Sequence, residues 1–120
     1  MNIKITGVGS YIPNIRVVNK DFDKHVFLND DGTPFSHLNE VVIEKFKLIT
    51  GIEERRYAEN HLCSSDLAFI AAQRAIENAN IDPETLDYII LAHNFGDVKH
   101  NTTQSDMLPS LATRVKNKLQ

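Results

Sequence analysis

Three groups of side chains in this sequence could carry chemistry. The single cysteine, Cys63, precedes a predicted helix, and a thiol near a helix N-terminus gains the thiolate character of a nucleophile. His93, Asp97 and His100 lie close together in a polar segment, and these residue types bind metal ions. The glycines of GVG, residues 7–9, follow a predicted strand, as they do in a dinucleotide-binding loop.

Each group lacks a further requirement of its chemistry. The histidine nearest to Cys63 in the sequence is His61, two residues before it, so we interpret Cys63 as filling a small pocket rather than as catalytic. The two histidines and the aspartate have no helical or hairpin frame, so we assign no metal site. A dinucleotide loop needs a third glycine at position 12, where this chain has Ile12, so we interpret the glycines as bending the end of a strand.

The stretch TGIEERRYAE, residues 50–59, contains four consecutive charged residues, Glu53 to Arg56. Its arginines could pair with Glu53 and Glu54 or face a phosphate-bearing ligand. On the residues alone, a solvated turn of ion pairs is favoured. The alternation over Arg55–Tyr57 is typical of a short edge strand.

Strands and a long helix surround these groups. Alternation at residues 3–5 and the apolar run YIILA at 88–92 predict two strands, the second covered on both faces. Between them, an alanine-rich apolar stretch predicts a buried helix that starts near Ser64 or Ser65 as its cap, with Asp66 in its first turn. Together they predict a βαβ unit with a right-handed crossover. The expected core residues are Leu67, Ile70, Ala71, Ala75, Ile89, Ile90 and Leu91.

The other elements are shorter. We expect a short helix capped by Asn19, a turn at 29–34, and a helix over 38–49 that stops at Gly51. Asp82-Pro83 predicts a further short turn, with Asp82 as the cap and Pro83 at the first helical position. A last helix lies within 107–119, with Pro109 in its first turn and Asp106 as its cap.

Composition limits the classes of function. The chain has 120 residues, 42% of them hydrophobic, enough for one compact domain. A net charge of −3 without a basic stripe argues against nucleic acid or an anionic membrane as a partner. The lone cysteine, the absence of a secretory signal and the shortness of the apolar runs predict a cytoplasmic globular protein.

Four stretches occur in the order typical of β-ketoacyl-ACP synthase III, a condensing enzyme of the thiolase superfamily. They are GVGSYIPNIRVVN, TGIEERRYAE, SSDLAFIAAQRAIENANIDPETLDYIILA and LPSLATRVKNKL. The chain resembles the N-terminal part of that family over nearly its whole length. The resemblance implies an α/β protein, the N-terminal part of a thiolase-like αβαβα fold whose core sheet is incomplete in residues 1–120. These residues would form a portion of the first of two thiolase-like halves, with the rest of the enzyme outside this chain.

The resemblance also implies an acyltransferase that works as a homodimer in fatty-acid synthesis or a related pathway. A cysteine takes an acyl group from acyl-CoA, and a His–Asn pair stabilises the enolate formed as malonyl-ACP loses carbon dioxide. No cofactor is implied. In the family these three residues follow the part matched here, so we expect no catalytic residue within this chain.

Two substrate-binding regions follow from the resemblance. The helix ending at Thr50 borders the mouth of the CoA tunnel, where Lys45 and Ile49 replace the family's adenine-stacking Trp and nucleotide-facing Arg. Because Lys cannot stack on a base as Trp does, we expect a different acyl donor or one presented on an acyl-carrier protein. Leu108 stands where acetyl-specific members commonly have Phe, at a position that crosses the dimer interface and closes the partner's acyl pocket. On the residues alone, Leu108 folding back onto its own helix is favoured.

Two loops, Leu28–Asn39 and Asn94–Asp106, are longer than is usual in the family. Alternative functions of the same fold are a hydroxymethylglutaryl-CoA synthase-like enzyme, a secondary-metabolite ketosynthase, and a non-catalytic subunit that keeps the fold for dimerisation. The residue at the family's nucleophile position would distinguish the last alternative from the enzymes.

Overall fold

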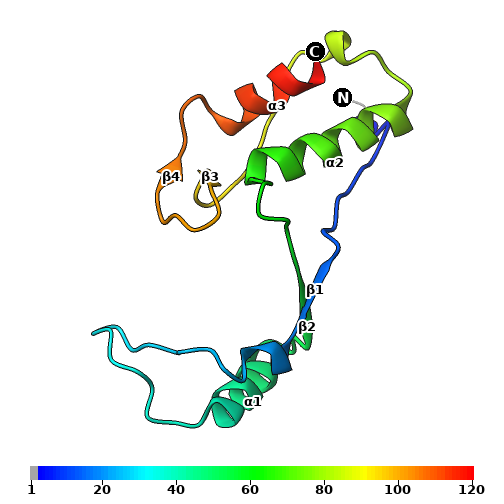
Figure 1. Cartoon of the computed structure of the whole chain (residues 1–120). Helices are drawn as coiled ribbons and strands as arrows, with labels where there is room; N and C mark the ends of the chain where they lie inside the picture. The colour runs from blue at the N-terminus through cyan, green and yellow to red at the C-terminus, as the bar shows by residue number, and fades with distance from the viewer. Residues whose placement is uncertain (1–2) are drawn as a thin grey trace. The chain divides into compact units, whose positions relative to one another are not determined.

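The computed structural model describes residues 3–120, which divide into two compact units (Figure 1). One unit contains residues 13–57, and the other contains the residues up to 12 together with 58–120. The elements in chain order are β1 (Ile15–Val18), η1 (Asn19–Phe22), α1 (Asn39–Thr50), β2 (Glu54–Tyr57), α2 (Ser64–Ala79), η2 (Pro83–Thr85), β3 (Asp97–Val98), β4 (Ser105–Asp106) and α3 (Leu111–Leu119). This mixture of helices and small sheets confirms the α/β class.

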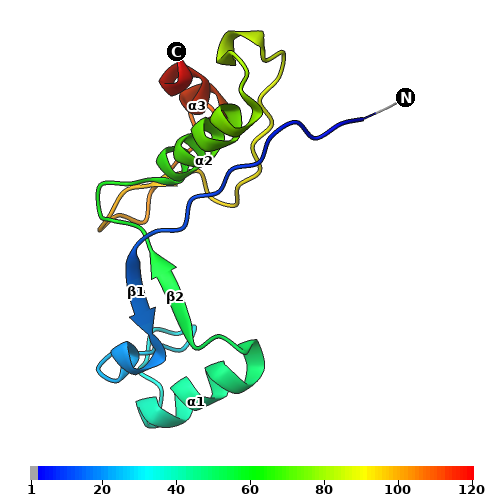
Figure 2. The same cartoon turned by 90° about the vertical axis from the view of Figure 1, so that its right-hand side faces the viewer.

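In the unit of residues 13–57, β1 and β2 form an antiparallel pair (Figure 2). Ile15 lies opposite Tyr57, and Val18 lies opposite Glu54. Asn19 continues the pairing, since its backbone N–H donates to the Glu53 carbonyl at 3.2 Å and its side-chain amide to the Ile52 carbonyl at 2.8 Å. The predicted edge strand at Arg55–Tyr57 is therefore confirmed, one residue longer at its start.

Helix α1 follows the prediction within one residue at each end, and Gly51 ends it with φ 67°. Its first residue, Asn39, donates from its side-chain amide to the carbonyls of Asp23 and His25, at 2.8 and 2.7 Å. Val42 is the buried residue of the helix. These contacts attach α1 to the segment that follows η1.

The predicted turn at 29–34 is confirmed and is held by its own residues. The Asn29 N–H donates to the Thr33 carbonyl at 2.8 Å, and the Gly32 N–H donates to the Asn29 carbonyl at 2.9 Å. The Asp31 carboxylate accepts from both the N–H and the hydroxyl of Thr33.

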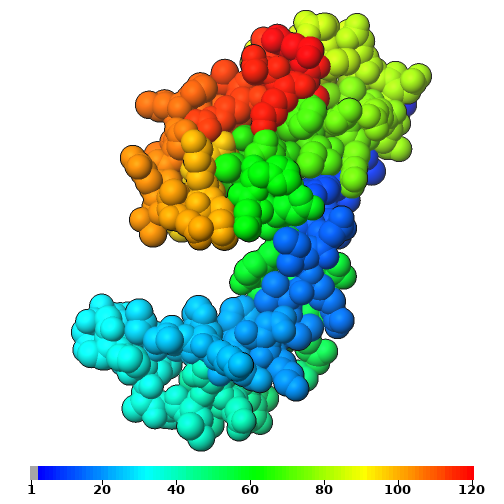
Figure 3. Space-filling view, in the orientation of Figure 1, coloured from blue at the N-terminus to red at the C-terminus, as the bar shows by residue number. Residues whose placement is uncertain are grey.

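In the other unit, α2 and α3 pack against each other (Figure 3), which confirms both helices. Leu111 and Val115 of α3 are each 1% exposed and form the centre of this contact. The N-terminal segment runs along α2 (Figure 2), and a Cβ on Gly7 or Gly9 would lie within 2.5 Å of an α2 carbonyl oxygen. These glycines therefore permit close approach of backbone to helix, which corrects their interpretation as the bent end of a strand.

The two predicted core strands are wrong as strands. Within the described residues the sheets are β1–β2 and β3–β4, both antiparallel, and residues 3–5 and 88–92 belong to neither, so the predicted βαβ unit does not form. The prediction that Ile90 is core is also wrong, because Ile90 is 96% exposed. The other six expected core residues are half-buried. Parallel strands depend on neighbouring strands and on cover over both faces, and neither segment has them here.

Three predicted helix starts also need correction. Ser110 caps α3, because its Oγ accepts from the Thr113 N–H at 3.3 Å; Pro109 therefore precedes the helix, and Asp106 is not its cap. Helix α2 begins after Cys63, whose N–H donates to Asp66 at 2.7 Å, so neither serine is the cap.

At the third corrected start, η1 follows Val18, so Asn19 is its first residue rather than its cap. By contrast, Asp82 caps η2 as predicted, accepting from the Glu84 N–H at 3.0 Å. Over residues 3–120, no helix has the length and apolar character to cross a lipid bilayer.

Candidate functional site

The first predicted substrate-binding region is the surface of α1. Lys45 and Ile49 lie four residues apart and therefore share one face of the helix. Both side chains are solvent-exposed, Ile49 to 81%. The face that the resemblance assigns to the tunnel mouth thus presents one ammonium group and one aliphatic side chain, and no aromatic ring.

Thr50, the third residue of this region, uses its hydroxyl to finish the helix. The Oγ1 donates to the Phe46 carbonyl at 2.6 Å and accepts from the Ile52 N–H at 3.1 Å. The donor capacity of this hydroxyl is therefore used inside the protein, and a ligand here would meet an oxygen that can only accept.

Three of the four charged residues that follow α1 form ion pairs: Glu53, Glu54 and Arg56. Lys47 bonds Glu53 at 2.8 Å, and this hydrogen bond lowers the pKa of Glu53 and raises the pKa of Lys47. Glu54 pairs with Arg16 and, at 3.6 Å, with Arg56. The predicted pairing of the arginines with the glutamates of this stretch is thus confirmed for Arg56 and Glu54, whereas Glu53 pairs with Lys47 of α1 instead.

Arg55 lies instead 5.1 Å from the centre of the Phe22 ring, at an aromatic cavity that the sequence analysis missed. The cavity measures about 160 Å³ and is lined by Asn19, Phe22, Phe27, Ile43, Phe46 and Arg55. His25 is exposed, but its ring also packs edge-on against Phe22 and Phe27. Phe22, Phe27 and Phe46 do not recur at the spacing of a helix or a strand, so no periodicity groups them.

The second predicted region is Leu108, between β4 and α3. Its side chain is 84% exposed, so the alternative in which it folds back onto its own helix is wrong. Its backbone, in contrast, is held: the Leu108 carbonyl accepts from Arg114 Nη2 at 2.9 Å, and the Pro109 carbonyl accepts from Arg114 Nε at 3.0 Å.

A buried polar network lies beside Leu108. Asp97 is 5% exposed and accepts three hydrogen bonds, from the Ser65 N–H at 2.8 Å, the Ser65 hydroxyl at 2.7 Å and Arg114 Nη1 at 2.9 Å. Asp97 is one of the three candidate metal-binding side chains in the sequence, but these donors occupy its carboxylate. A buried aspartate rarely lacks a cationic partner, so an arginine would be expected beside Asp97 once its burial is known. The sequence alone does not show that burial.

The other members of the candidate metal group are not gathered around Asp97. His93 Nδ1 accepts from the Gly96 N–H at 3.0 Å, which makes a local turn. Over residues 3–120, no three side chains of the His, Cys, Asp and Glu types lie close enough together to hold a metal ion.

Cys63 also touches this loop, with its Sγ 3.8 Å from the Val98 carbonyl. Burial raises the pKa of the Cys63 thiol, and the negative charges of Asp97 and Asp66 raise it further. Burial also acts on Asp66, but the hydrogen bonds from Lys118 and from the Cys63 N–H hold its pKa below the usual value. The surroundings of Cys63 therefore favour the neutral thiol over the thiolate.

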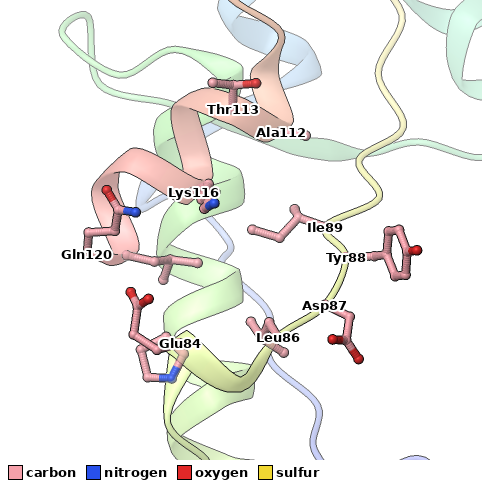
Figure 4. A pocket seen from close by; sticks show the side chains of 11 residues that line it. Glu84, Leu86, Asp87, Tyr88, Ile89, Ala112, Thr113, Lys116 and Gln120 are labelled. Atoms are coloured by element: carbon pink, nitrogen blue, oxygen red, sulfur yellow. The ribbon is translucent and has the colours of Figure 1, made fainter.

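A further cavity, of about 250 Å³, lies between the segment after η2 and helix α3 (Figure 4). Ile89 points toward α3 in this view, whereas Tyr88 points away from it. Tyr88 is 87% exposed and Ile89 half-buried, so the segment shows the alternation of a strand with only one face covered.

Comparisons with known proteins place these observations in a family context. No family model matches the chain. It is 35% identical over 119 residues to the β-ketoacyl-[acyl-carrier-protein] synthase III of Oceanobacillus iheyensis, and 34% identical over 119 residues to that of Listeria innocua. The chain is similar to β-ketoacyl-ACP synthase III. Each match covers 99% of this chain and 31% of the relative, so the chain spans under a third of the length of these relatives.

Solved structures agree with the sequence comparison. The 3-oxoacyl-[acyl-carrier-protein] synthase III of Aquifex aeolicus superimposes with a TM-score of 0.67 at 34% identity, covering 97% of this chain and 30% of that one. The priming β-ketosynthase of the R1128 polyketide pathway gives a TM-score of 0.60 at 25% identity, covering 97% of this chain and 28% of that one. The resemblance to synthase III and its partial thiolase-like fold are therefore confirmed.

Proposed function

We propose that the chain is the N-terminal portion of a condensing acyltransferase of the synthase III type. Residues 1–120 form a portion of its first thiolase-like half, and the nucleophilic Cys and the His–Asn pair come from the remainder of the enzyme. The observation that carries the proposal is the similarity to synthase III over 99% of the chain, together with the match to a synthase III structure at a TM-score of 0.67.

The complete enzyme joins an acyl thioester to malonyl-ACP with loss of carbon dioxide, as a cytoplasmic homodimer that starts fatty-acid synthesis or a related pathway. The similarity to the R1128 priming β-ketosynthase supports one variant, the priming of a polyketide. The assay is release of carbon dioxide from labelled malonyl-ACP in the presence of acyl donors of several lengths. Absence of condensation with every donor would leave the non-catalytic subunit as the better interpretation.

Lys45, Ile49 and Thr50 form the donor-facing surface in this proposal. Since α1 presents an exposed ammonium group and an aliphatic side chain there, it offers a base no ring to stack on. Free acetyl-CoA therefore binds weakly compared with an acyl group on a carrier protein. Isothermal titration with both donors measures this difference, and tight binding of acetyl-CoA that depends on its adenine would contradict the assignment.

Leu108 closes the acyl pocket of the partner subunit in this proposal. Its 84% exposure leaves the side chain available to a partner, as this role requires.

A further inference from the structure

Arg114 makes four polar contacts with the turn that carries Leu108 and the loop before it. Its Nε bonds the Pro109 carbonyl at 3.0 Å, and its Nη2 bonds the Leu108 carbonyl at 2.9 Å and the Asp106 carboxylate at 2.8 Å. Its Nη1 bonds Asp97 at 2.9 Å. Every nitrogen of the guanidinium group is therefore bonded.

The guanidinium is itself fixed, because Asp97 is anchored from a third element. Ser65, at the start of α2, binds Asp97 through both its N–H and its hydroxyl. The Asp97 side chain is 6% exposed and the Arg114 side chain 19%. Charge-assisted hydrogen bonds sheltered from water are stronger than neutral, solvent-exposed ones. Arg114 therefore holds the turn of Leu108 directly and is connected to α2 through Asp97.

Leu108 combines a held backbone with a free side chain. Its carbonyl is bound by Arg114, while its side chain is 84% exposed. The position of the side chain is consequently determined by the polar contacts of its backbone and not by apolar packing. Lysine could not replace this function fully, since its ammonium group lacks the planar set of donors that reaches two carbonyls and two carboxylates together.

We propose that Arg114 is a positioning residue for acyl-chain specificity: it fixes where Leu108 projects and so sets the depth of the acyl pocket. This inference rests on the proposed function, which assigns Leu108 to the pocket of the partner subunit.

The test measures the ratio of kcat/KM for acetyl and longer acyl donors in the complete enzyme. Arg114→Met releases the turn, and we expect the ratio to change by about fourfold or more, the effect of one methylene in the pocket. Arg114→Lys should restore part of the ratio. Lys118→Met is the matched control, since it removes another ion pair of α3, with Asp66, without touching the turn. It should leave the ratio unchanged.

A double-mutant cycle shows whether Arg114 acts through Leu108. In a Leu108→Ala background, Arg114→Met should have no further effect on the ratio, because the side chain being positioned is gone. If Leu108 variants change the ratio and Arg114→Met does not, the positioning role is wrong and the proposed function survives.

A crystal structure of the Arg114→Met protein gives a readout that does not depend on activity. We expect the Leu108 backbone to shift or lose order relative to α2. Suppose that the Leu108 backbone is displaced in the variant but the unsubstituted complete protein has no condensing activity. Arg114 then positions Leu108 as inferred, whereas the proposed function and the role in acyl-chain specificity are wrong. A Leu108 backbone that keeps its place would overturn the inference.

Discussion

The two long loops of this chain are stabilised in opposite ways. The first, Leu28–Asn39, is closed over residues 28–34 by contacts among its own residues, chiefly those of Asn29, Asp31 and Thr33, all of them exposed. The loop at 94–106 is held by Ser65 and Arg114, which lie 32 and 17 residues from Asp97 in the sequence. The turn of the first loop depends on neighbouring residues, whereas the second loop, besides its own β3–β4 pairing, depends on contacts with α2 and α3.

The largest expected effect follows from the buried carboxylate. Asp97→Ala removes the acceptor of Arg114 Nη1, of the Ser65 N–H and of the Ser65 hydroxyl, although Arg114 keeps Asp106 and two carbonyls. Each buried donor left unsatisfied costs about 1–3 kcal/mol. We expect a clear fall in the thermal midpoint of the complete protein. Asp31→Ala, the matched change in the first loop, should alter the midpoint little. Equal effects of the two variants would contradict the comparison.

A pair of glycine substitutions tests the same contrast at smaller scale. Gly32 and Gly96 both have positive φ, 80° and 74°, so alanine at either position costs about 1–2 kcal/mol in backbone strain. A Cβ at Gly32 meets nothing within 4 Å, whereas at Gly96 it would lie 2.7 Å from the Asp106 carbonyl oxygen. Overpacking should make Gly96→Ala about 1–3 kcal/mol worse than Gly32→Ala in denaturant unfolding.

Leu108 offers a test of function at the far end of the second loop. If Leu108 closes the acyl pocket as proposed, Leu108→Phe in the complete enzyme should shorten the preferred acyl donor, because the larger ring fills space otherwise open to about one methylene. The change in specificity should be a few-fold, as measured by competition between acetyl and longer donors. Leu48→Phe, at another exposed leucine of the chain, is the control and should leave the chain-length profile as it is.

The smallest effect concerns Cys63 beside the same loop. Its pKa is raised, so at neutral pH the group is almost entirely the unreactive thiol, and thiolate forms only above the usual range. Alkylation by iodoacetamide, followed on the Cys63 peptide by mass spectrometry, should be slower than that of glutathione at pH 8. Its rate should still rise with pH after the glutathione rate has levelled off. A faster reaction at pH 7 would show an activated thiol and contradict the assignment.

Several local elements of the fold were predictable because their hydrogen-bond partners lie within the same short segment. Helix α1 and the turn at 29–34 matched the prediction within a residue or were confirmed outright, and Asp82 caps η2 as expected. The site was less predictable. The sequence predicted a cap at Asp106 and no specific role for Asp97, whereas in the structure both carboxylates pair with Arg114.

For residues 88–92, the local sequence predicts an extended conformation but not whether a partner strand is present. Their apolar run indicates a strand, and the alternating burial of Tyr88 and Ile89 agrees with extended backbone. A sheet needs a partner strand, however, and in the described chain none is paired with this segment.

The sequence by itself determined features whose bonding partners lie within a few residues, namely the Gly51 end of α1, the turn at 29–34 and the Asp82 cap of η2. Four motifs in order also carried the family resemblance. Only the tertiary structure decided that Asp97 is buried, that Gly7 and Gly9 lie against α2, and that Arg114 holds the turn of Leu108. The reason is physical. A bond within one turn depends on residue type and spacing, whereas a bond across 32 residues depends on how whole helices pack.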